Sequence, residues 1–591
     1  MNNAGRIAAV LTAVLAGLSM TSAAYSEQEA VSAEVVPSED HKAISPYIYG
    51  VNSGADLSKV SAKSFRLGGN RLSAYNWENN ASNAGSDWKH TSDMYLVRNA
   101  SEENKQLPGG AALDAAAEAK AGNVPYTLLT LQMLGYVSSD KAGAVSEEKA
   151  APSEFWYEVR NRKEGELLLE PDLTDNAVYM DEYLNYLISK LGKSDSENGF
   201  KAYALDNEPA LWQYTHCRVQ QEPLSCAELI EKTVSLASAV KDADGGAEVF
   251  GPSLFGYSAF DSLAGAPDWS GLKQDNGYRW FIDYYLDQMH KAEMTKGVRL
   301  LDVLDLHFYT EAKGVCGERS CNHYGNDECV MARLNSVRAL YDDSYRENSW
   351  ITDTGAKFFP LLPNIQQSVD TYYPDTKIAF TEYNFGGGDH ISGGVCQADF
   401  LGILAEYGVY FASIWSFDNN EYQLAAINMF TNYDGSGNGF GNTLVKSSCG
   451  SGDISVYSSI DGEDESTVKI MVTNRSIHSE MPVTISLSSE NGYEKAQVYS
   501  LYGESSRIQR LDDVPSIEEN SFTYTLPPLS VTEFIVTAEQ DNRSEQQGGV
   551  SELRQDDQPE KSGISPVLLI SAAAAAVAVI AAAVTIKLRK K

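Results

Sequence analysis

The segment YALDNEPALW, residues 203–212, places three acid or amide side chains directly after a short apolar run and directly before a proline. They are Asp206, Asn207 and Glu208. A second carboxylate, that of Glu382, follows the apolar run KIAF in the segment KIAFTEY, residues 377–383. Two glutamates brought to one place from separate strands can divide the roles of acid and nucleophile in the cleavage of a glycosidic bond. The pair therefore indicates carboxylate chemistry, provided that the fold brings it together.

The separation of the two carboxyl groups would decide the mechanism. A retaining glycosidase needs them about 5–5.5 Å apart, whereas an inverting enzyme needs roughly 6.5–9.5 Å. At the shorter distance the two charges repel each other, so one glutamate takes a raised pKa and stays protonated as the acid. The alternative for the first glutamate is structural, because an Asn-Glu-Pro sequence can also cap the helix that follows it.

Other polar and aromatic side chains fall near the same predicted strand ends. The candidates for substrate binding are Asn207, Asn70, Trp212, His307, Tyr309, Tyr383 and Trp415. The aromatic residues among them could stack on sugar faces, although a single aromatic residue is more often part of the core. We expect His307 to be a hydrogen-bonding support rather than a metal ligand, because no second His or Cys lies at ligand spacing. The sequence assigns no metal ligands.

The elements that must position these residues are eight short apolar, β-rich runs between residues 48 and 415. They are IYGVN at 48, KSFRLG at 63, PYTLLTLQ at 125, KAYALD at 201, EVFGPS at 248, LDVLDLHFY at 301, KIAFTEY at 377 and VYFASIW at 409. Most are nearly continuous in apolar character, as parallel strands covered on both faces should be, and segments with helical spacing separate many of them. The repeat predicts an α/β fold, a (β/α)8 TIM barrel with its functional groups at the C-terminal ends of the strands.

After about residue 450 the pattern changes to short alternating segments separated by Gly, Ser, Asn and Pro. This pattern predicts an additional all-β sandwich domain, to which the segment AVSAEVVP near residues 30–37 is expected to add a strand. The stretch that follows is almost without apolar residues and predicts a disordered stalk. The predicted domains are a signal peptide at 1–24, an N-terminal segment joining the sandwich at 25–45, the catalytic barrel at 46–448, the sandwich at 449–539, the stalk at 540–565, a transmembrane helix at 566–586 and a basic cytoplasmic tail at 587–591.

The composition is that of a globular protein: 43% of the 591 residues are hydrophobic and 21% are charged. The formal net charge of −35 argues against nucleic acid as a partner, because a phosphate-binding surface needs a basic patch and none is visible. An acidic surface suits an exported protein with a neutral ligand such as a polysaccharide. We expect the protein to be a monomer.

Both ends of the chain resemble targeting segments. Arg6 precedes the apolar run IAAVLTAVLAGL, and small residues end at Ala24, which together predict a secretory signal peptide. Near the other end, Val567–Ile586 is twenty residues long without a charge and is followed by KLRKK. That length is enough to cross the roughly 30 Å hydrocarbon core, and basic residues stay on the cytoplasmic side. The predicted location is therefore the cell surface, through a C-terminal transmembrane helix, unless the tail is removed and the protein is secreted.

The chain has seven cysteines, which in an exported protein indicate disulfides rather than metal ligands. Cys217 and Cys226 could bridge one loop, and the three cysteines between residues 316 and 329 could contribute to another. The odd number leaves at least one cysteine unpaired, and the spacing fits no structural zinc pattern well.

Five separated stretches of the chain resemble glycoside hydrolase family 44. They are RLGGNRLSAYNWENNASNAGSDW (66–88), YALDNEPALW with TH at 215–216, LDVLDLHFY (301–309), LYDDSYRENSWI (340–351) and KIAFTEYNFGGGDHISGGVCQADFLGIL (377–404). The resemblance spans roughly residues 45–450. It implies a (β/α)8 enzyme with an attached β-sandwich that acts on β-1,4-glucans, including xyloglucan.

The resemblance also implies roles for individual residues. The glutamate of the NEP motif, Glu208, would be the general acid/base, and the glutamate of the TEYN motif, Glu382, would be the nucleophile of a retaining mechanism. Asn207 would bind the 2-hydroxyl of the sugar beside the cleavage point. We expect no required cofactor. Some members of the family carry structural calcium, so calcium is possible here, but its ligands do not map onto this sequence.

The chain departs from the family pattern at several positions, so subsite preference stays open. Leu67 and Phe385 stand where the family commonly has Trp, and the segment CRVQQEPLSCAEL after His216 lacks the expected acidic and histidine residues. The first hypothesis is that the protein is an endo-acting β-1,4-glucanase or xyloglucanase. The alternatives are the same enzyme class acting on mannan or xylan, and a glycan-binding surface protein without catalysis.

Overall fold

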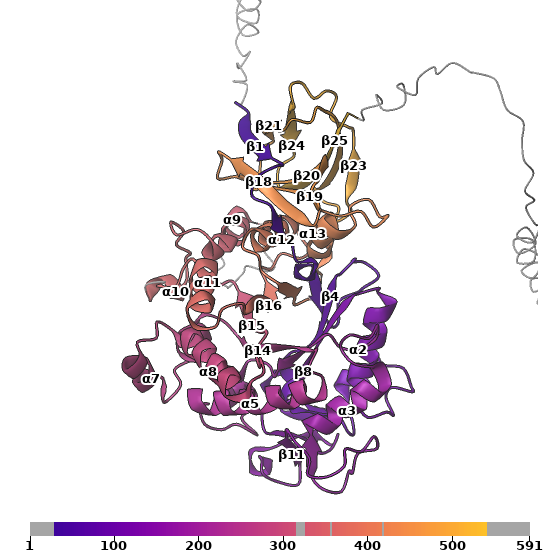
Figure 1. Ribbon diagram of the computed structural model, residues 1–591, viewed down its shortest axis with the longest axis vertical. Coiled ribbons are helices and arrows are strands. Elements are labelled where there is room, and N and C mark those ends of the chain that lie inside the picture. The colour runs from indigo at the N-terminus through magenta and orange to yellow at the C-terminus, as the bar shows by residue number, and fades with distance from the viewer. Residues whose placement is uncertain (1–28, 315–325, 355–356, 417–418, 540–591) are drawn as a thin grey trace, which may run out of the picture. The chain divides into compact units, whose positions relative to one another are not determined.

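The computed structural model describes residues 29–314, 326–354, 357–416 and 419–539. These residues form a barrel and a β-sandwich (Figure 1). The sequence predictions for residues 1–24 and 540–591 concern segments outside these ranges.

All eight apolar runs form strands of one closed parallel barrel. They are β3 (Gly50–Asn52), β4 (Ser64–Leu67), β8 (Tyr126–Leu131), β13 (Ala202–Leu205), β14 (Glu248–Leu254), β15 (Val303–Tyr309), β16 (Lys377–Asn384) and β17 (Phe411–Ile414). The barrel closes where β17 pairs with β3, at Ser413 with Gly50 and Ile414 with Val51. Helices cover the outer face and side chains fill the interior, which explains why the runs are apolar on both faces. The predicted TIM-type barrel is confirmed.

Seven longer helices lie around the barrel strands (Figure 1). They are α2 (Gly110–Ala121), α3 (Met180–Leu191), α5 (Cys226–Ala243), α8 (Phe281–Lys296), α11 (Leu361–Tyr372), α12 (Ile391–Glu406) and α13 (Glu421–Thr431). Helix α5 shows how the sequence specifies them: the Ser225 hydroxyl caps its first turn by accepting from the Glu228 amide at 3.1 Å. Leu229, Leu236 and Val240 are then buried on its inner face.

Shorter helices and two small sheets fill the connections between barrel strands. Among the described residues, the other α-helices are α4 (Trp212–Thr215), α6 (Tyr257–Ser262), α7 (Trp269–Asn276), α9 (Asp327–Ser336) and α10 (Trp350–Asp353). The 3-10 helices are η1 (Pro46–Ile48), η2 (Asn70–Ala74), η3 (Gly85–Trp88), η4 (Tyr95–Val97), η5 (Glu147–Lys149), η6 (Pro209–Leu211) and η7 (Val337–Leu340). One small sheet has the order β10 (Gly143–Ala144), β7 (Thr91–Asp93), β6 (Ala81–Asn83), β5 (Tyr75–Asn76), and the other β12 (Ala177–Tyr179), β11 (Trp156–Arg160), β9 (Tyr136–Ser138).

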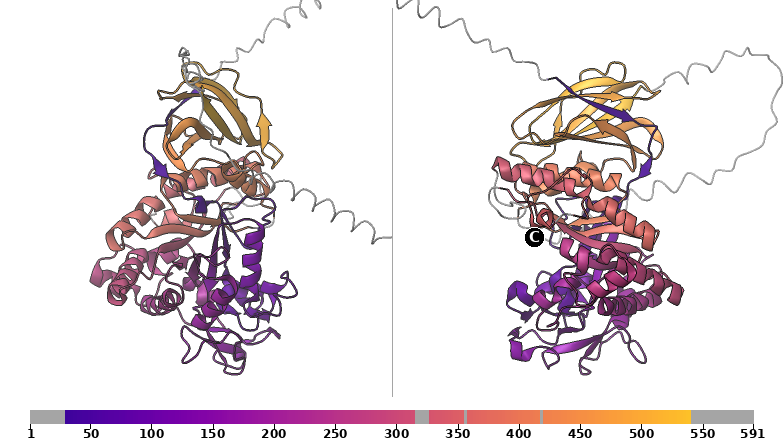
Figure 2. Two further views of the ribbon diagram at one scale, coloured as in Figure 1. Left: turned by 45° about the vertical axis from the view of Figure 1, so that its right-hand side comes forward. Right: turned by 90° about the vertical axis from the view of Figure 1, so that its left-hand side faces the viewer.

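The sandwich is built from the C-terminal strands together with two strands from the start of the described chain. Its strands are β1 (Val31–Val36), β2 (Lys42–Ala43), β18 (Thr443–Cys449), β19 (Ile454–Asp461), β20 (Asp464–Asn474), β21 (Met481–Leu487), β22 (Tyr493–Tyr502), β23 (Gln509–Leu511), β24 (Ser521–Leu526) and β25 (Ser530–Ala538). Strand β1 pairs antiparallel with β18 and parallel with β21, and Figure 2 shows it in indigo among the orange and yellow strands. The alternating residues of these strands enclose a separate apolar core.

Helix α12 joins the barrel to the sandwich through one buried aspartate. The Asp399 carboxylate accepts a hydrogen bond from the Thr473 hydroxyl at 2.7 Å and lies 3.4 Å from the Arg475 guanidinium. The Tyr457 hydroxyl donates to the backbone carbonyl of Asp399 at 3.3 Å. Because all four residues are buried, these polar contacts fix the sandwich against the barrel.

The predicted fold class included a transmembrane helix as a third part, and this part is wrong. Among the helices of the described residues, none is long and apolar enough to cross a membrane. The segment 566–586, to which the prediction assigned the helix, lies outside those residues. The corrected architecture is the barrel with its sandwich.

The bridge that Cys217 and Cys226 could have formed is not made, because both are free thiols. The Cys217 sulfur lies 3.7 Å from Nε2 of His90. The backbone amide of Cys226 instead donates to Asp268 at the start of α5, so the two cysteines have different neighbours. Cys316 and Cys321 lie outside the described residues.

Candidate active site

The turn after β13 holds the polar cluster of the DNEP sequence. Asp206 and Glu208 both adopt left-handed backbone conformations, with φ values of +66° and +47°. The Asp206 carboxylate stabilises this turn, because it accepts hydrogen bonds from the backbone amides of Met133 at 2.5 Å, Leu134 at 2.8 Å and Asn207 at 2.7 Å. Such conformations cost on the order of 1–3 kcal/mol each and persist where surrounding contacts hold them. Asp206 is therefore the residue that shapes the turn, and Glu208 is the residue that the turn presents.

Glu208 and Glu382 meet at the side chain of His307. The Nδ1 atom of His307 donates to Oε1 of Glu208 at 2.9 Å and lies 3.5 Å from Oε2 of Glu382. One carboxylate oxygen of each glutamate and a ring nitrogen of His307 all lie within 4.8 Å of one another. Oxygen atoms no more than 4.8 Å apart are too close for the roughly 6.5–9.5 Å of an inverting pair, so the spacing favours the retaining geometry of about 5–5.5 Å.

A buried arginine, Arg66 on β4, completes the arrangement. Its guanidinium donates to Glu382 at 2.7 Å, to the side-chain oxygen of Asn207 at 2.8 Å and to that of Asn52 at 3.0 Å. A side chain at Gly68 would place its Cβ 2.2 Å from the Arg66 guanidinium carbon, so this position requires glycine. Arg66 was not among the residues predicted from the sequence, although a lone arginine inside the apolar run KSFRLG is an unusual feature that pointed to it.

The electrostatics of the site separate the two glutamates. Burial raises the pKa of Glu208, and the nearby charge of Glu382 raises it further. Burial alone would also raise the pKa of Glu382, but the positive charges of His307 and Arg66, with hydrogen bonds from Arg66 and Tyr309, outweigh burial and lower it. Burial opposes the charged form of His307, yet the two carboxylates outweigh it and raise the pKa of this imidazole. A protonated Glu208 beside an ionised Glu382 is the division that an acid and a nucleophile need.

Of the other predicted residues, Tyr309 contacts Glu382 directly and Asn207 contacts Arg66. The Tyr309 hydroxyl donates to Oε2 of Glu382 at 3.0 Å. The Asn207 side-chain oxygen accepts from Arg66, which leaves the amide NH2 group of Asn207 as its donor toward a ligand.

Comparison with known proteins identifies the family. A profile for glycoside hydrolase family 44 matches residues 81–312. The chain is also 44% identical over 504 residues to Endoglucanase A of Paenibacillus lautus, an alignment that covers 85% of this chain and 71% of that protein. The chain belongs to glycoside hydrolase family 44.

Two further known proteins are similar to most of this chain. The solved structure of a Paenibacillus polymyxa xyloglucanase from family 44 with xyloglucan has a TM-score of 0.83 and 42% identity, covering 86% of this chain and all (100%) of that one. Beta-mannanase/endoglucanase A of Caldicellulosiruptor saccharolyticus is 44% identical over 512 residues, which are 84% of this chain. The matched region is 38% of that relative, so the chain spans well under half of its length.

Two of the aromatic residues predicted to bind sugar in this family 44 chain do not reach the site surface. Trp212 and Tyr383 are both fully buried. The Trp212 indole donates to the backbone carbonyl of Asn207 at 3.1 Å, so it supports the turn from beneath. The Tyr383 hydroxyl accepts from Gln397 of α12 at 2.7 Å, on the outer side of the barrel wall. The prediction that these two rings stack on a sugar is therefore wrong.

Asn70 and Trp415 lie near the rim, after β4 and β17, which are separated by β3 in the barrel. The Asn70 amide donates to Asp87 at 2.8 Å, and its backbone carbonyl accepts from His216 at 2.9 Å. Trp415 is half-buried against Gly69, whose φ of +94° and lack of a side chain let the indole ring approach. Neither residue contacts the glutamate pair directly in the contacts described, so their binding roles stay predictions.

The glutamate pair and His307 could also be considered as metal ligands, since their donor atoms converge. The Arg66 guanidinium already places a positive charge 2.7 Å from Glu382, however, and would repel a cation there.

A second group of carboxylates surrounds Glu78, which is 5% exposed, and within this group the Lys163 ammonium lies 2.6 Å from Glu182. One carboxylate oxygen of Glu78 has no hydrogen-bond partner among the described residues, and neither has one oxygen of the buried Glu182. Burial, together with the negative charges of Asp175, Glu182 and Asp172, raises the pKa of Glu78 to about 8. Buried carboxylate oxygens in such surroundings are the ligands that calcium prefers.

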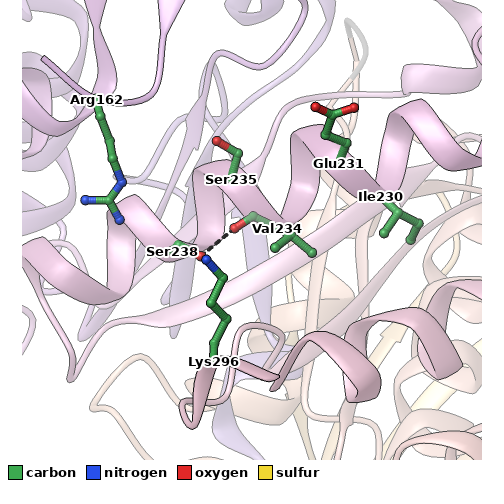
Figure 3. A pocket seen from close by; sticks show the side chains of 7 residues that line it. All are labelled: Arg162, Ile230, Glu231, Val234, Ser235, Ser238 and Lys296. Atoms are coloured by element: carbon green, nitrogen blue, oxygen red, sulfur yellow. Dashed lines mark hydrogen bonds between the residues drawn. The ribbon is translucent and has the colours of Figure 1, made fainter. Parts of the chain in front are cut away.

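A pocket of about 440 Å³ lies on the outer surface of the barrel between α5 and the end of α8 (Figure 3). Arg162, Glu231, Ser238 and Lys296 are among the residues that line it, and the Ser238 hydroxyl donates to the carbonyl of Val234 within α5. Because its lining contains neither Glu208 nor Glu382, this pocket is separate from the candidate active site.

Proposed function

We propose that the protein is a retaining, endo-acting glycoside hydrolase that cleaves β-1,4-linked glucans of the cellulose or xyloglucan type. The observation that carries the proposal is the pair Glu208 and Glu382, whose oxygens lie within 4.8 Å and whose pKa values shift in opposite directions. The names of the relatives support the substrate class, since they include an endoglucanase and a xyloglucanase.

In the first step, Glu382 attacks the anomeric carbon while Glu208 protonates the departing oxygen. Glu382 is suited to the attack because the Arg66 and His307 charges keep it ionised. Glu208 is suited to the protonation because burial and the charge of Glu382 raise its pKa and so favour its protonated form. The step gives a covalent glycosyl ester on Glu382.

In the second step, Glu208 becomes the base. Ester formation removes the negative charge of Glu382, so one of the causes that raise the pKa of Glu208 disappears. Glu208 has also lost its proton to the leaving group and can accept one from water, which then releases the sugar. The same residue thus serves both half-reactions.

Asn207 fits the role of a donor to the sugar next to the cleavage point. Its side-chain oxygen is held by Arg66, which also binds Glu382, so the amide is fixed relative to the nucleophile. A hydrogen bond from this amide to the 2-hydroxyl would tighten as positive charge develops on the ring.

The test is the release of reducing ends from xyloglucan, carboxymethyl cellulose, glucomannan and xylan. We expect the highest rate on one of the two β-1,4-glucans, and loss of activity in Glu382→Ala. A highest rate on glucomannan or xylan would favour the alternative substrates, of which mannan has a specific reason, since one relative is named a mannanase. Binding without any release would favour a non-catalytic glycan-binding protein.

We also propose a structural calcium ion at Glu78, with Asp172, Asp175 and Glu182 as the nearby carboxylates. The unpartnered buried oxygen of Glu78 supports the proposal, because a buried ionised carboxylate needs a compensating partner. Glu182 already accepts from the Lys163 ammonium at 2.6 Å, so only its second oxygen is open to an ion. The ion would compensate this charge and hold the connections that follow β4 and β8.

Export, the monomeric state and the absence of a required cofactor stay predictions. Export rests on the first 24 residues, which lie outside the described ranges.

A further inference from the structure

A pocket of about 200 Å³ opens directly beside Glu208. It is formed by the connections after β13, β14 and β15, together with α10 and the start of α11. Half of its fourteen lining residues are aromatic, among them Phe255, Tyr257, Phe308, Trp350 and Phe359. Pockets for drug-sized ligands usually measure about 300–1,000 Å³, so this pocket has room for roughly one ring.

The position of the pocket relative to the two glutamates defines which part of a substrate enters it. Of the pair, Glu208 lines the pocket and Glu382 is not among the described lining residues. Glu208 is the group that protonates the leaving oxygen and later activates the incoming hydroxyl. The pocket is therefore on the side of the leaving group in the first step, and on the side of the incoming nucleophile in the second.

The chemistry of the walls favours an apolar ring over water. The Tyr257 ring lies edge-on to Trp350 and to Phe359, with centroid distances of 6.0 and 5.6 Å. Trp350 is 37% exposed, so part of its ring is available for contact. Burial of apolar surface is favourable by roughly 25 cal/mol per Å², and aromatic pairs add to it. A water molecule gains nothing comparable from these walls.

We propose that this pocket is an acceptor site, through which the enzyme transfers the glycosyl group from Glu382 to alcohols that carry an aromatic ring. The proposal rests on the retaining function proposed above. The bond between the anomeric carbon and the Glu382 oxygen breaks, and a bond to the acceptor oxygen forms. The acceptor's hydroxyl proton passes to Glu208, and Glu382 leaves as a carboxylate. The product is an aryl-alkyl glycoside in place of a free sugar.

The experiment compares two alcohols as acceptors during cleavage of a cello-oligosaccharide. The full chain is incubated with the donor and equal concentrations of 2-phenylethanol and ethanol, and mass spectrometry measures the two glycosides and the hydrolysis product. We expect at least a tenfold higher yield of the phenylethyl glycoside than of the ethyl glycoside. Equal yields, or no phenylethyl glycoside, would overturn the proposal.

Two variants at the pocket and one elsewhere test the assignment. Trp350→Ala should lower the ratio of transfer to hydrolysis severalfold, and Trp350→Phe should retain most of it. This ratio is independent of how fast the glycosyl-enzyme forms, so a general loss of activity does not change it. Tyr407→Ala removes another surface aromatic residue, 36% exposed, and should leave the ratio unchanged. A ratio that survives Trp350→Ala would contradict the assignment.

The outcomes separate this proposal from the one on which it rests. If no polysaccharide and no oligosaccharide is hydrolysed, the proposed function itself fails. If hydrolysis proceeds but phenylethanol is not preferred, only the acceptor site fails.

Discussion

The guanidinium of Arg66 and the carboxylate of Glu382 form an ion pair of 2.7 Å at the centre of the barrel, with side chains 0% and 7% exposed. The pair joins β4 to β16, which are far apart in the sequence. In such buried surroundings each charge depends on the other, because an unpaired buried charge is strongly disfavoured. Arg66 therefore has two effects: it keeps Glu382 ionised for attack, and it stabilises the barrel interior.

We predict that Arg66→Met raises the pKa of Glu382 and lowers both activity and stability. Activity requires ionised Glu382, so the acid limb of the kcat/KM profile should move to higher pH. Loss of one positioned donor should lower kcat on the order of 100-fold, and loss of a buried partner should cost about 3–5 kcal/mol in the free energy of unfolding. A pH–rate profile and urea unfolding measure the two effects.

The control is Arg338→Met, which removes a more exposed ion pair with Asp342. It should cost less than about 1 kcal/mol and leave the acid limb in place. An unchanged acid limb in Arg66→Met would contradict the role assigned to this arginine.

We predict that Tyr309→Phe shifts the same acid limb without a large change in stability. The Tyr309 hydroxyl donates to Glu382 and favours its charged form, so its removal raises the pKa of Glu382. Hydrogen bonds to charged groups are worth about 1.5–3 kcal/mol, which corresponds to a loss of roughly 10- to 100-fold in kcat/KM. Tyr383→Phe is the matched control, because that hydroxyl contacts Gln397 away from the site, and it should leave the profile unchanged.

We predict that Glu208→Gln fails on polysaccharides but retains its first step on substrates with an acidic aryl leaving group. Such a leaving group departs without protonation, whereas a sugar needs the acid, whose loss costs about 10²–10⁴-fold. Added azide should then release the glycosyl group as a β-glycosyl azide, since it needs no base. Glu311→Gln, at another carboxylate lining the same pocket, should show no azide effect. An α-azide from Glu208→Gln would show that the acid and nucleophile assignments are reversed.

The cluster at Glu78 predicts a stability that depends on pH and on calcium. The pKa of Glu78 is raised to about 8 in the folded protein, so between the unfolded value and about pH 8 the folded state binds more protons than the unfolded state. Stability without calcium should therefore be present at low pH and fall as the pH rises toward 8. Calcium should reduce this fall, and a chelator should restore it.

The variant Glu78→Gln should remove most of both the pH dependence and the calcium effect on the melting temperature. Glu102→Gln, at a surface carboxylate whose side chain is 88% exposed, should change neither. A melting temperature of the unaltered protein that is indifferent to calcium and chelator at pH 8 would exclude the proposed ion.

The sequence predicted the barrel well because its strands are covered on both faces. Each strand is a short apolar run bounded by polar residues, and the pattern is therefore visible without any knowledge of contacts. The polar residues at strand ends also stood out against these runs, which is why Glu208, Glu382, His307 and Tyr309 were found. Their convergence on one point could only be expected, since it depends on how eight strands close.

The wrong predictions have identifiable physical causes. Glu382 and Tyr383 are neighbours in β16, and successive side chains of a strand point to opposite faces. Glu382 therefore lies inside the barrel. Tyr383 packs on the outside, where its ring centroid lies 4.3 Å from that of Phe400 of α12. Strict attention to this alternation would have excluded Tyr383. Trp212 follows a turn that folds back beneath Asn207. This arrangement depends on the left-handed conformations of the turn, which the spacing of residues in the sequence does not indicate.

Arg66 was missed because its partner is distant in the sequence. An isolated arginine in an apolar strand needs a buried acidic partner, but the partner lies more than three hundred residues away. Its identity follows only from the closed barrel.

The most direct test of the account is to trap the covalent intermediate. The reagent is a cellobioside with fluorine at C2 and a good leaving group. The fluorine destabilises positive charge on the ring and so slows both formation and hydrolysis of the glycosyl-enzyme. The good leaving group speeds only the formation, so the intermediate accumulates. Peptide mass spectrometry after incubation should find one 2-fluorocellobiosyl group, attached to Glu382, and none in Glu382→Gln. A label on any other residue would contradict the proposed nucleophile. If no label forms and the first product from a β-linked substrate is the α-anomer, the retaining mechanism is contradicted.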